Sequence, residues 1–171
     1  MTIITKFRWF WAWNDEKEEA WLREMSQIGW HLSTVGIPGF YNFEQGFAKD
    51  YIYRLDYISN RKDYANYLQL FTDTGWDHLG EMSGWQYFRK ESINGENLEI
   101  YSDNESKANK YQRILLLLVI ILPLLINGLM IVSRRSGISD VFGIIFSGFI
   151  LIYIYSIIRI LIRIGKLKKK I

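Results

Sequence analysis

The sequence predicts an α+β fold, a ferredoxin-like βαββαβ plait, followed by a hairpin of two transmembrane helices. The segment Gly29-Trp30-His31-Leu32 returns as Gly75-Trp76-Asp77-His78-Leu79, and the segments before both glycines also superimpose at this offset. One strand-helix-strand unit used twice gives the plait's order of elements. Two long uncharged apolar runs after residue 113 predict the hairpin.

The first repeat begins with residues 5–13, whose aromatic side chains recur at every second position, as in a strand. Asp15 is expected to cap the helix that follows, and the neighbouring carboxylates to complement its dipole. Helical spacing of Trp21 and Met25 places an apolar stripe on one side of this helix. Gly29 is expected to end it in the left-handed conformation.

A strand region is expected from Trp30, interrupted by the turn residues 36–39. The second copy then follows, with a strand at residues 51–58, a helix capped by Asn60 and ended by Gly75, and a last strand at residues 85–89. Two right-handed crossovers would place both helices on one face of a four-stranded antiparallel sheet. The aromatic residues should line the helix-covered face.

The other face of this sheet is the first candidate site. It would carry Arg8, Phe10, Arg54 and Asp56. Charges in central strands are costly unless they are paired or hydrated, so an open face that binds a protein partner or an anionic ligand is one interpretation. An Arg–Asp pair on a hydrated face is the other.

The second half of the chain is expected to cross a membrane twice. The predicted parts are a cytoplasmic domain (1–101), a juxtamembrane helix (102–113) that a capping box opens, transmembrane helices (114–133 and 141–164), an extracellular loop (134–140) and a basic tail (165–171). Nine cations flank the spans on the domain's side, against two in the loop, so both termini should be cytoplasmic and the chain should lie in the cell membrane. The expected anchors at the membrane interface are Lys107, Lys110, Arg113, Arg159, Arg163 and Lys168. A buried hairpin in a soluble protein is the alternative.

Charge is divided between the two halves. Up to Ser106 there are ten Lys/Arg and seventeen Asp/Glu, whereas the rest has eleven and one. The basic half is the apolar half, so its charge indicates lipid head groups as partners and not nucleic acid. The chain has no cysteine, which excludes disulfides and thiolate chemistry.

The aromatic residues suggest a second candidate site. Trp9, Trp11, Trp30 and Trp76 could line a pocket for a flat or cationic compound, or form the core of a small domain. His31 and His78 follow the repeated Gly-Trp and could form a pH-sensitive pair. No ligand spacing accompanies them, so no metal and no cofactor is expected.

In the predicted spans, Asn127 could bond across a helix interface, and Gly128, Gly143 and Gly148 would allow close helix contact, within the chain or in a homo-oligomer. Neither a phosphate-binding loop nor a GxSxG or HExxH motif is present, so an enzyme is not expected.

Several segments carry a resemblance to a known family. They are residues 6–13, Glu19-Ala20-Trp21-Leu22, Gly29-Trp30-His31-Leu32, Tyr53-Arg54-Leu55-Asp56-Tyr57 and residues 102–106. With them the chain resembles, over about residues 5–113, a Gram-positive bacterial family catalogued as domain of unknown function 2812. Its members often carry carboxyl-terminal membrane spans and are often encoded beside PadR-type transcriptional regulators. The resemblance implies a regulatory or sensing role with such a regulator as partner, and it implies no catalytic residue.

Two functional hypotheses follow. The first is a membrane-anchored regulatory or sensor module whose cytoplasmic domain binds a protein partner. The alternative is a ligand-binding accessory subunit of a larger membrane complex such as an exporter.

Overall fold

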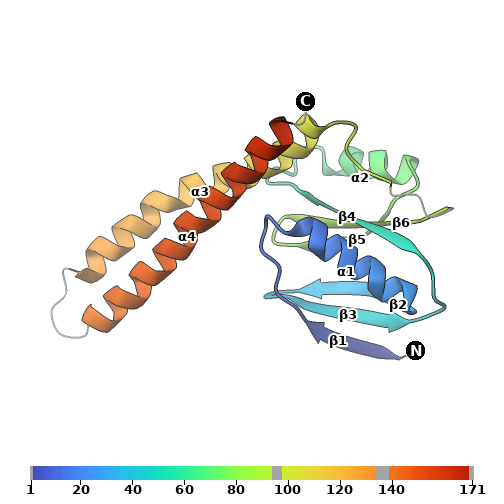
Figure 1. Ribbon diagram of the computed structural model, residues 1–171, viewed down its shortest axis with the longest axis horizontal. Coiled ribbons are helices and arrows are strands. Elements are labelled where there is room, and N and C mark those ends of the chain that lie inside the picture. Colours follow the sequence, from blue (N-terminus) through green and yellow to red (C-terminus); the bar gives the residue numbers. More distant parts are fainter. Residues whose placement is uncertain (1, 94–97, 134–138, 170–171) are drawn as a thin grey trace. The chain divides into compact units, whose positions relative to one another are not determined.

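The computed structural model describes residues 2–93, 98–133 and 139–169 (Figure 1). The chain forms two compact units, Met1–Ser102 and Asp103–Ile171. The first unit mixes helices and strands, and the second consists of two helices.

The amino-terminal unit consists of two copies of a β-α-β-β element. The first copy contains β1 (Ile3–Phe7), α1 (Asp15–Gln27), β2 (Trp30–Gly36) and β3 (Phe40–Gln45); the second contains β4 (Tyr51–Tyr57), α2 (Tyr64–Asp73), β5 (Asp77–Met82) and β6 (Trp85–Glu91). Each copy forms its own antiparallel three-stranded sheet, in the orders β1-β3-β2 and β4-β6-β5. Both sheets have an irregularity at the same place, between Leu32 and Thr34 and between His78 and Gly80.

The internal repeat is therefore present, but the predicted four-stranded ferredoxin-like sheet is not what the strands form. Residues 36–39 make a hairpin turn that reverses the chain, so the segment on each side of it is a separate strand. β3 then lies between β1 and β2 and completes a sheet within the first copy. Each copy therefore has one strand more than predicted. This strand occupies the position in the sheet that a strand of the other copy would hold in the predicted four-stranded sheet.

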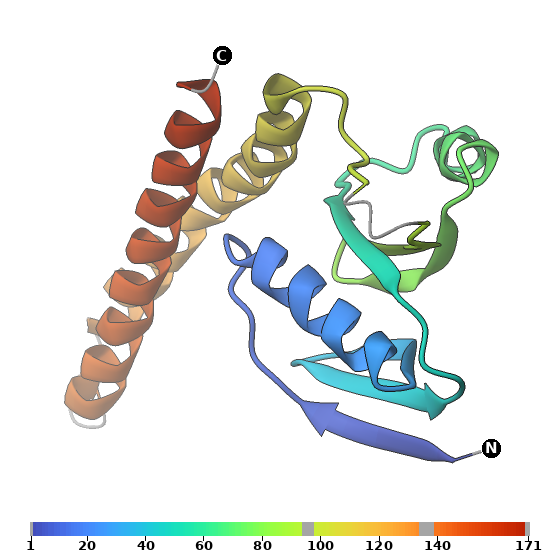
Figure 2. The same ribbon diagram turned by 45° about the vertical axis from the view of Figure 1, so that its right-hand side comes forward.

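Helix α1 lies between the two sheets, whereas α2 covers the far side of the second sheet (Figures 1 and 2). One apolar core joins Trp21, Leu22 and Met25 of α1 to residues of both sheets, among them Phe43 and Leu55. A second core joins Ile52, Trp76 and Phe88 to α2. Successive residues of a strand face opposite sides, so covering both sides buries residues 52–57 of β4.

The first strand is shorter than predicted. β1 ends at Phe7, which pairs with Phe40, the first residue of β3. Residues 8–14 continue the aromatic alternation without a strand partner, and there Trp11 stacks on Trp13 at 5.2 Å between ring centroids. The period-two pattern thus extends beyond the length of the neighbouring strand that could pair with it.

The helix ends combine expected and shifted features. Gly29 and Gly75 follow α1 and α2 with φ of 83° and 80°, the left-handed conformation predicted for both. The amino ends are displaced: Asn14 precedes α1, Asp63 precedes α2, and neither makes a side-chain capping bond. Asn60 instead accepts a bond from the Lys62 N–H in the turn before α2.

The carboxyl-terminal unit is an antiparallel hairpin of α3 (Asn104–Ser133) and α4 (Ser139–Lys168). Asp103 caps α3 by accepting bonds from the N–H and hydroxyl of Ser106, one residue later than the predicted capping box. Pro123 lies within α3, and Tyr153 donates a hydrogen bond across the hairpin to the Leu118 carbonyl at 2.8 Å. Residues 134–138 of the predicted loop and residues 170–171 of the tail lie outside the described residues.

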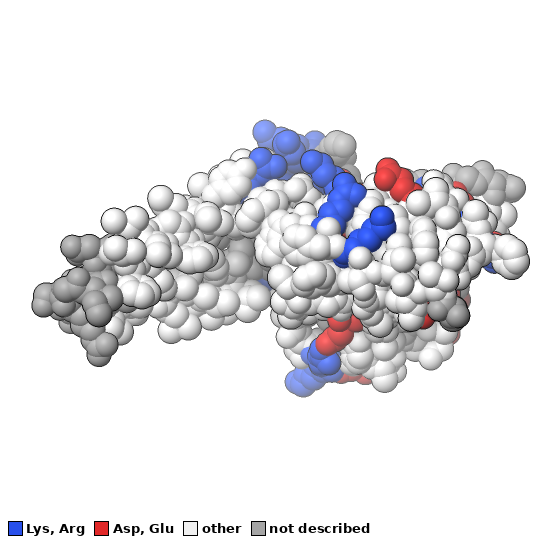
Figure 3. Space-filling view, turned by 90° about the horizontal axis from the view of Figure 1, so that it is seen from below, with Lys and Arg blue, Asp and Glu red and all other residues white. Residues whose placement is uncertain are grey.

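Both helices are long and apolar enough to cross a membrane. Their large side chains face outward; Leu124, Ile144 and Leu151 are 68%, 74% and 67% exposed. A core helix of a soluble protein would bury such side chains, whereas the most apolar stretches of α3 and α4 bury almost none of theirs within the chain. On the side seen in Figure 3, the surface of the hairpin carries no charge between the undescribed loop and its cationic end.

Replacing Gly29 by alanine is expected to destabilise the amino-terminal unit more than replacing Gly75. Positive φ costs either alanine about 1–2 kcal/mol. A Cβ at Gly29 would also meet the Gly46 carbonyl oxygen at 2.7 Å, whereas at Gly75 it meets only the flexible end of Lys90 at 3.5 Å. All seven tryptophans precede residue 102, so tryptophan fluorescence during heating of the full chain in detergent reports this unit. Equal losses would contradict the close backbone contact.

Candidate functional site

A carboxylate and two tyrosines meet in the interior between the two sheets. Glu18 of α1 is 6% exposed, and its Oε1 accepts hydrogen bonds from the hydroxyls of Tyr41 on β3 and Tyr87 on β6, each 2.7 Å long. Glu18 lies one turn before Trp21 and Leu22, on the apolar side of the helix, which carries its carboxylate into the core. The group thus links both sheets through α1.

Burial determines how these groups ionise. It raises the pKa of Glu18, while the two tyrosine hydrogen bonds oppose that shift and the nearby Asp15 carboxylate adds to it. Burial and the charge on Glu18 raise the pKa of both tyrosines above the ordinary range. Both phenols therefore remain protonated donors at neutral pH.

A cavity of about 60 Å³ adjoins this cluster. Its lining combines aromatic rings with charged groups, among them Arg8, Phe10, Trp11, Asp15, Glu18, Tyr41, Trp85 and Tyr87. Liquid water occupies about 30 Å³ per molecule and drug-sized ligands need several hundred, so this space suits water or a small ion.

Arg8 and Phe10 belong to this region. The guanidinium carbon of Arg8 lies 5.0 Å from the Trp21 ring and 5.2 Å from the Phe10 ring, within cation–π distance. Phe10 also packs on Trp21, at 5.7 Å between centroids. Arg8 and Phe10, two of the four residues predicted to form the partner face, thus lie together near the first sheet.

Arg54 and Asp56, the other two residues of that face, are buried elsewhere, at 7% and 4% exposure. The prediction of one open face was wrong because sheet β4-β6-β5 is covered on both sides. Arg54 pairs with Glu19 at 3.3 Å and with Glu99 at 3.4 Å. Asp56 accepts bonds from three donors: the hydroxyls of Tyr67 and Tyr101, at 3.0 and 2.5 Å, and the N–H of Tyr57.

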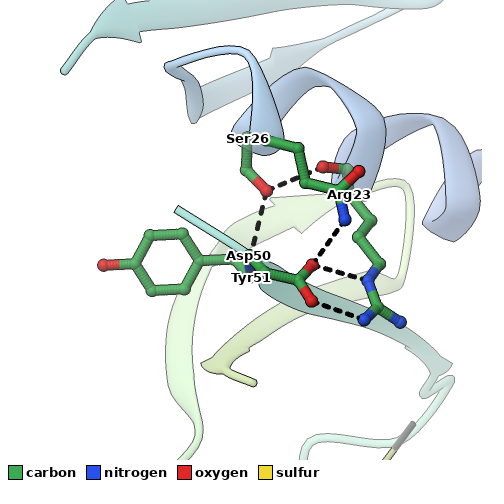
Figure 4. A network of polar contacts seen from close by, with 5 residues as sticks. Arg23, Ser26, Asp50 and Tyr51 are labelled. Carbon is green, nitrogen blue, oxygen red and sulfur yellow. Dashed lines mark hydrogen bonds and ion pairs between the residues drawn. The ribbon is translucent and has the colours of Figure 1, made fainter. Parts of the chain in front are cut away.

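Side chains of α1 also accept hydrogen bonds from N–H groups at the outer edge of β4. The Glu19 Oε1 accepts the Leu55 N–H at 2.9 Å, and the Ser26 hydroxyl accepts the Tyr51 N–H at 3.2 Å. Figure 4 shows the end of this contact, where Arg23 holds both carboxylate oxygens of Asp50 at 2.6–2.7 Å. The guanidinium lowers the pKa of Asp50. An open groove of about 300 Å³ beside this edge is lined by Glu16, Glu19, Ala20, Arg23, Tyr53, Arg54 and Glu99.

The four tryptophans of the predicted pocket do not share one. Trp11 lines the small cavity, whereas Trp76 is 5% exposed in the core beneath α2. Trp30 packs against the main core, and Trp9 is 53% exposed beside Trp11. Trp30 and Trp76 thus serve packing.

The two histidines also lie apart, one on each sheet. The Nε2 of His31 lies 2.8 Å from the Phe47 carbonyl oxygen, and that of His78 lies 2.9 Å from the Gln86 amide oxygen. Within the described ranges, no group of three or more His, Cys, Asp or Glu residues is arranged to hold a metal ion.

In the hairpin, the predicted cationic anchors gather at one end because α3 begins beside the end of α4. Arg163 of α4 lies 3.3 Å from the Tyr111 hydroxyl of α3, and the Lys110 ammonium lies 5.2 Å from the centre of the same ring. Lys110 is only 1% exposed, so the prediction of an exposed anchor at this position was wrong. Lys107 and Arg113 lie on the first turns of α3, and Arg159 and Lys168 on the last turns of α4.

The predicted helix contacts divide into two groups. The Asn127 amide bonds to the Pro123 carbonyl of its own helix, not across an interface. A Cβ at Gly128 would meet the Phe146 ring at 3.1 Å, so this glycine does permit a close contact. Gly143 and Gly148 face open space.

The sequence did not identify Glu18 and Glu19 as buried groups, because both carboxylates could be attributed to the helix dipole and solvent. A signal existed for Glu18, which lies three and four positions before Trp21 and Leu22 and so shares their side of the helix. None existed for Glu19, whose partners come from a distant strand edge.

In a comparison with protein families, the family model "Protein of unknown function (DUF2812)" matches residues 14–122. Neither a curated protein nor a solved structure matches the chain.

Replacing Glu18 by glutamine should raise the melting temperature increasingly as pH rises from about 4 to 8. An acid with a raised folded pKa binds more protons when folded, so its contribution to stability falls as pH rises. Glutamine still accepts the tyrosine bonds and carries no charge to bury. Tryptophan fluorescence melting of wild type and Glu18→Gln across this range measures the difference.

Asp50→Asn is the matched control with the opposite sign. Asp50 has a lowered pKa, so its stabilisation is present at neutral pH and is lost on acidification. The deficit of Asp50→Asn should therefore shrink as pH falls. A pH-independent difference for Glu18→Gln would show that its carboxylate is not desolvated.

Proposed function

The chain belongs to the DUF2812 family of proteins of unknown function, and from this premise we propose that it is a membrane-anchored regulatory module. Its hairpin inserts in the cell membrane with both termini in the cytoplasm, and its amino-terminal unit binds a protein partner. A PadR-type transcriptional regulator is the candidate partner.

The junction between domain and hairpin carries this proposal. Two residues shortly before α3 are fixed to the interior of the second sheet: Tyr101 donates to Asp56, and Glu99 pairs with Arg54. Both targets are on β4, which α1 also contacts through Glu19. A change at the domain surface that shifts α1 or β4 is thereby coupled to the segment that leads into the membrane.

Two further observations support a binding role. The surface exposes large aromatic side chains, including Phe7, Trp9 and Phe40, which is typical of a surface that binds another protein. Nine cations flank the spans on the domain's side, which supports the proposed orientation.

The accessory-subunit alternative is favoured by one observation. A Cβ added at Gly143 or Gly148 of α4 would meet no atom within 4 Å, so these positions leave room for a helix of another membrane protein. In that case the hairpin would bind the larger complex, and the domain would modulate it.

Membrane insertion can be tested by placing a charge in the apolar run. An arginine at the centre of a span costs about 2.5–3.5 kcal/mol of insertion free energy. Ile120→Arg should therefore reduce the share of full-length chain that resists alkaline carbonate extraction. Gln112→Arg, on an exposed position of α3 before the run, is the control and should leave extraction unchanged. Equal extraction of both variants would argue against a spanning α3.

The partner is tested by affinity purification of the tagged full-length chain from native membranes, followed by mass spectrometry. A PadR-type regulator should be enriched with the full chain and absent with the tagged hairpin, residues 103–171, alone. Repeated recovery of no regulator would refute this partner. A transporter recovered equally with chain and hairpin would support the accessory-subunit function instead.

A further inference from the structure

The first sheet has one side that faces away from α1 (Figure 2). Phe7 and Phe40 pair across β1 and β3 on this side, with ring centroids 5.2 Å apart and exposures of 59% and 43%. Ile3 lies four residues before Phe7 on the same side of β1 and is 61% exposed. Between them, Thr5 donates to Asn42, and Asn42 donates to Thr34. This side, the outer face, thus has exposed apolar side chains at both ends, with Glu44 opposite Ile3 at one of them, and internal hydrogen bonds in the middle.

The internal repeat identifies what covers the corresponding side of the second sheet. Aligning the two strand irregularities superimposes Asn42 on Tyr87 and Phe40 on Trp85. Tyr87 belongs to the core that α1 forms, and Trp85 packs against it. The side that is exposed in the first sheet is therefore covered in the second sheet by the helix of the preceding copy.

The helix that corresponds to α1 is α2, and its second side is uncovered. α1 presents Glu19, Arg23 and Ser26 to β4. At the repeat offset these positions become Ala65, Gln69 and Thr72, and all three are exposed. No residue of α2 is buried. In the described part of the unit, the first sheet thus has one uncovered side, and α2 has an uncovered side at the opposite end of the stack of sheets and helices.

We propose that α2 of one chain packs on the outer face of a second copy of this chain. The contact repeats between molecules the layer that α1 and the second sheet form within one molecule. Such a contact is heterologous, because it joins two different surfaces, and it extends head to tail into a ring or a row. It goes beyond the proposed function and does not depend on the identity of any other partner.

Cysteine crosslinking tests this contact, since the chain has no cysteine of its own. Thr5→Cys marks the centre of the outer face and Gln69→Cys the uncovered side of α2; both positions are exposed. Full-length chains with these single changes and different tags are co-expressed, and their membranes are treated with a short bismaleimide. The yield of the crosslinked product between the Thr5→Cys chain and the Gln69→Cys chain should exceed the background. The background is the yield between the Thr5→Cys chain and a Glu24→Cys chain, whose cysteine lies on the exposed side of α1.

Two other results would overturn the proposal. Crosslinking of Thr5→Cys to itself in preference to Gln69→Cys would show two outer faces packed back to back. No product above the background would show that α2 does not pack on the outer face. Unchanged tryptophan fluorescence melting of each variant confirms folding.

A second variant tests the same contact without relying on crosslinker geometry. Phe40→Glu places a charge on the outer face, and the loss of one aromatic contact should reduce the mixed product about tenfold. Phe47→Glu, at a position 91% exposed outside the sheet, should leave it unchanged. Equal yields from both variants would place the contact elsewhere.

Discussion

Helix α1 has to satisfy two sheets at once, and the rest of the amino-terminal unit depends on this constraint. Toward the first sheet it supplies Trp21 and Met25. Toward β4 it supplies polar groups, because the edge of that strand presents N–H donors that need acceptors. A helix on a surface needs one apolar side only, whereas this one needs two sides of different chemistry. Its sequence therefore combines the apolar stripe of an amphipathic helix with polar residues that face β4.

The buried charges of β4 follow from the same constraint. A buried ion pair such as Arg54 with Glu19 is weak evidence for stability, since desolvation of both groups offsets their attraction. Its effect is on uniqueness. Glu19 binds the Arg54 side chain and the Leu55 N–H together, so α1 has one favourable position along the strand. Asp56, surrounded by two tyrosine hydroxyls and the Tyr57 N–H, fixes α2 and the segment before α3 in the same way.

Local features could be predicted from the sequence, whereas the arrangement of the sheets could not. Gly29 and Gly75 were recognisable because a left-handed helix end favours glycine, and the two long apolar helices because each comes from a long uncharged run. The predicted sheet topology was wrong because residues 36–39 are compatible either with an interruption in one strand or with a hairpin turn between two strands. Arg54 and Asp56 were placed on an open face by that topology. Burial of Glu18 depends on Tyr41 and Tyr87, which lie in different repeats and meet only in the folded chain.

The differences between the two repeats bear on how strong a contact between chains can be. Within the chain, α1 holds β4 through Glu19, whose carboxylate accepts an edge N–H and pairs with an arginine. The equivalent position in α2 is Ala65, which has no acceptor. An α2 packed on another chain's outer face would gain apolar contact with Phe7 and Phe40 but not this charge-assisted bond. The proposed layer between chains would therefore be weaker than the layer within one chain, and reversible. A reversible layer could respond to the number of neighbouring chains, whereas the layer within one chain could not.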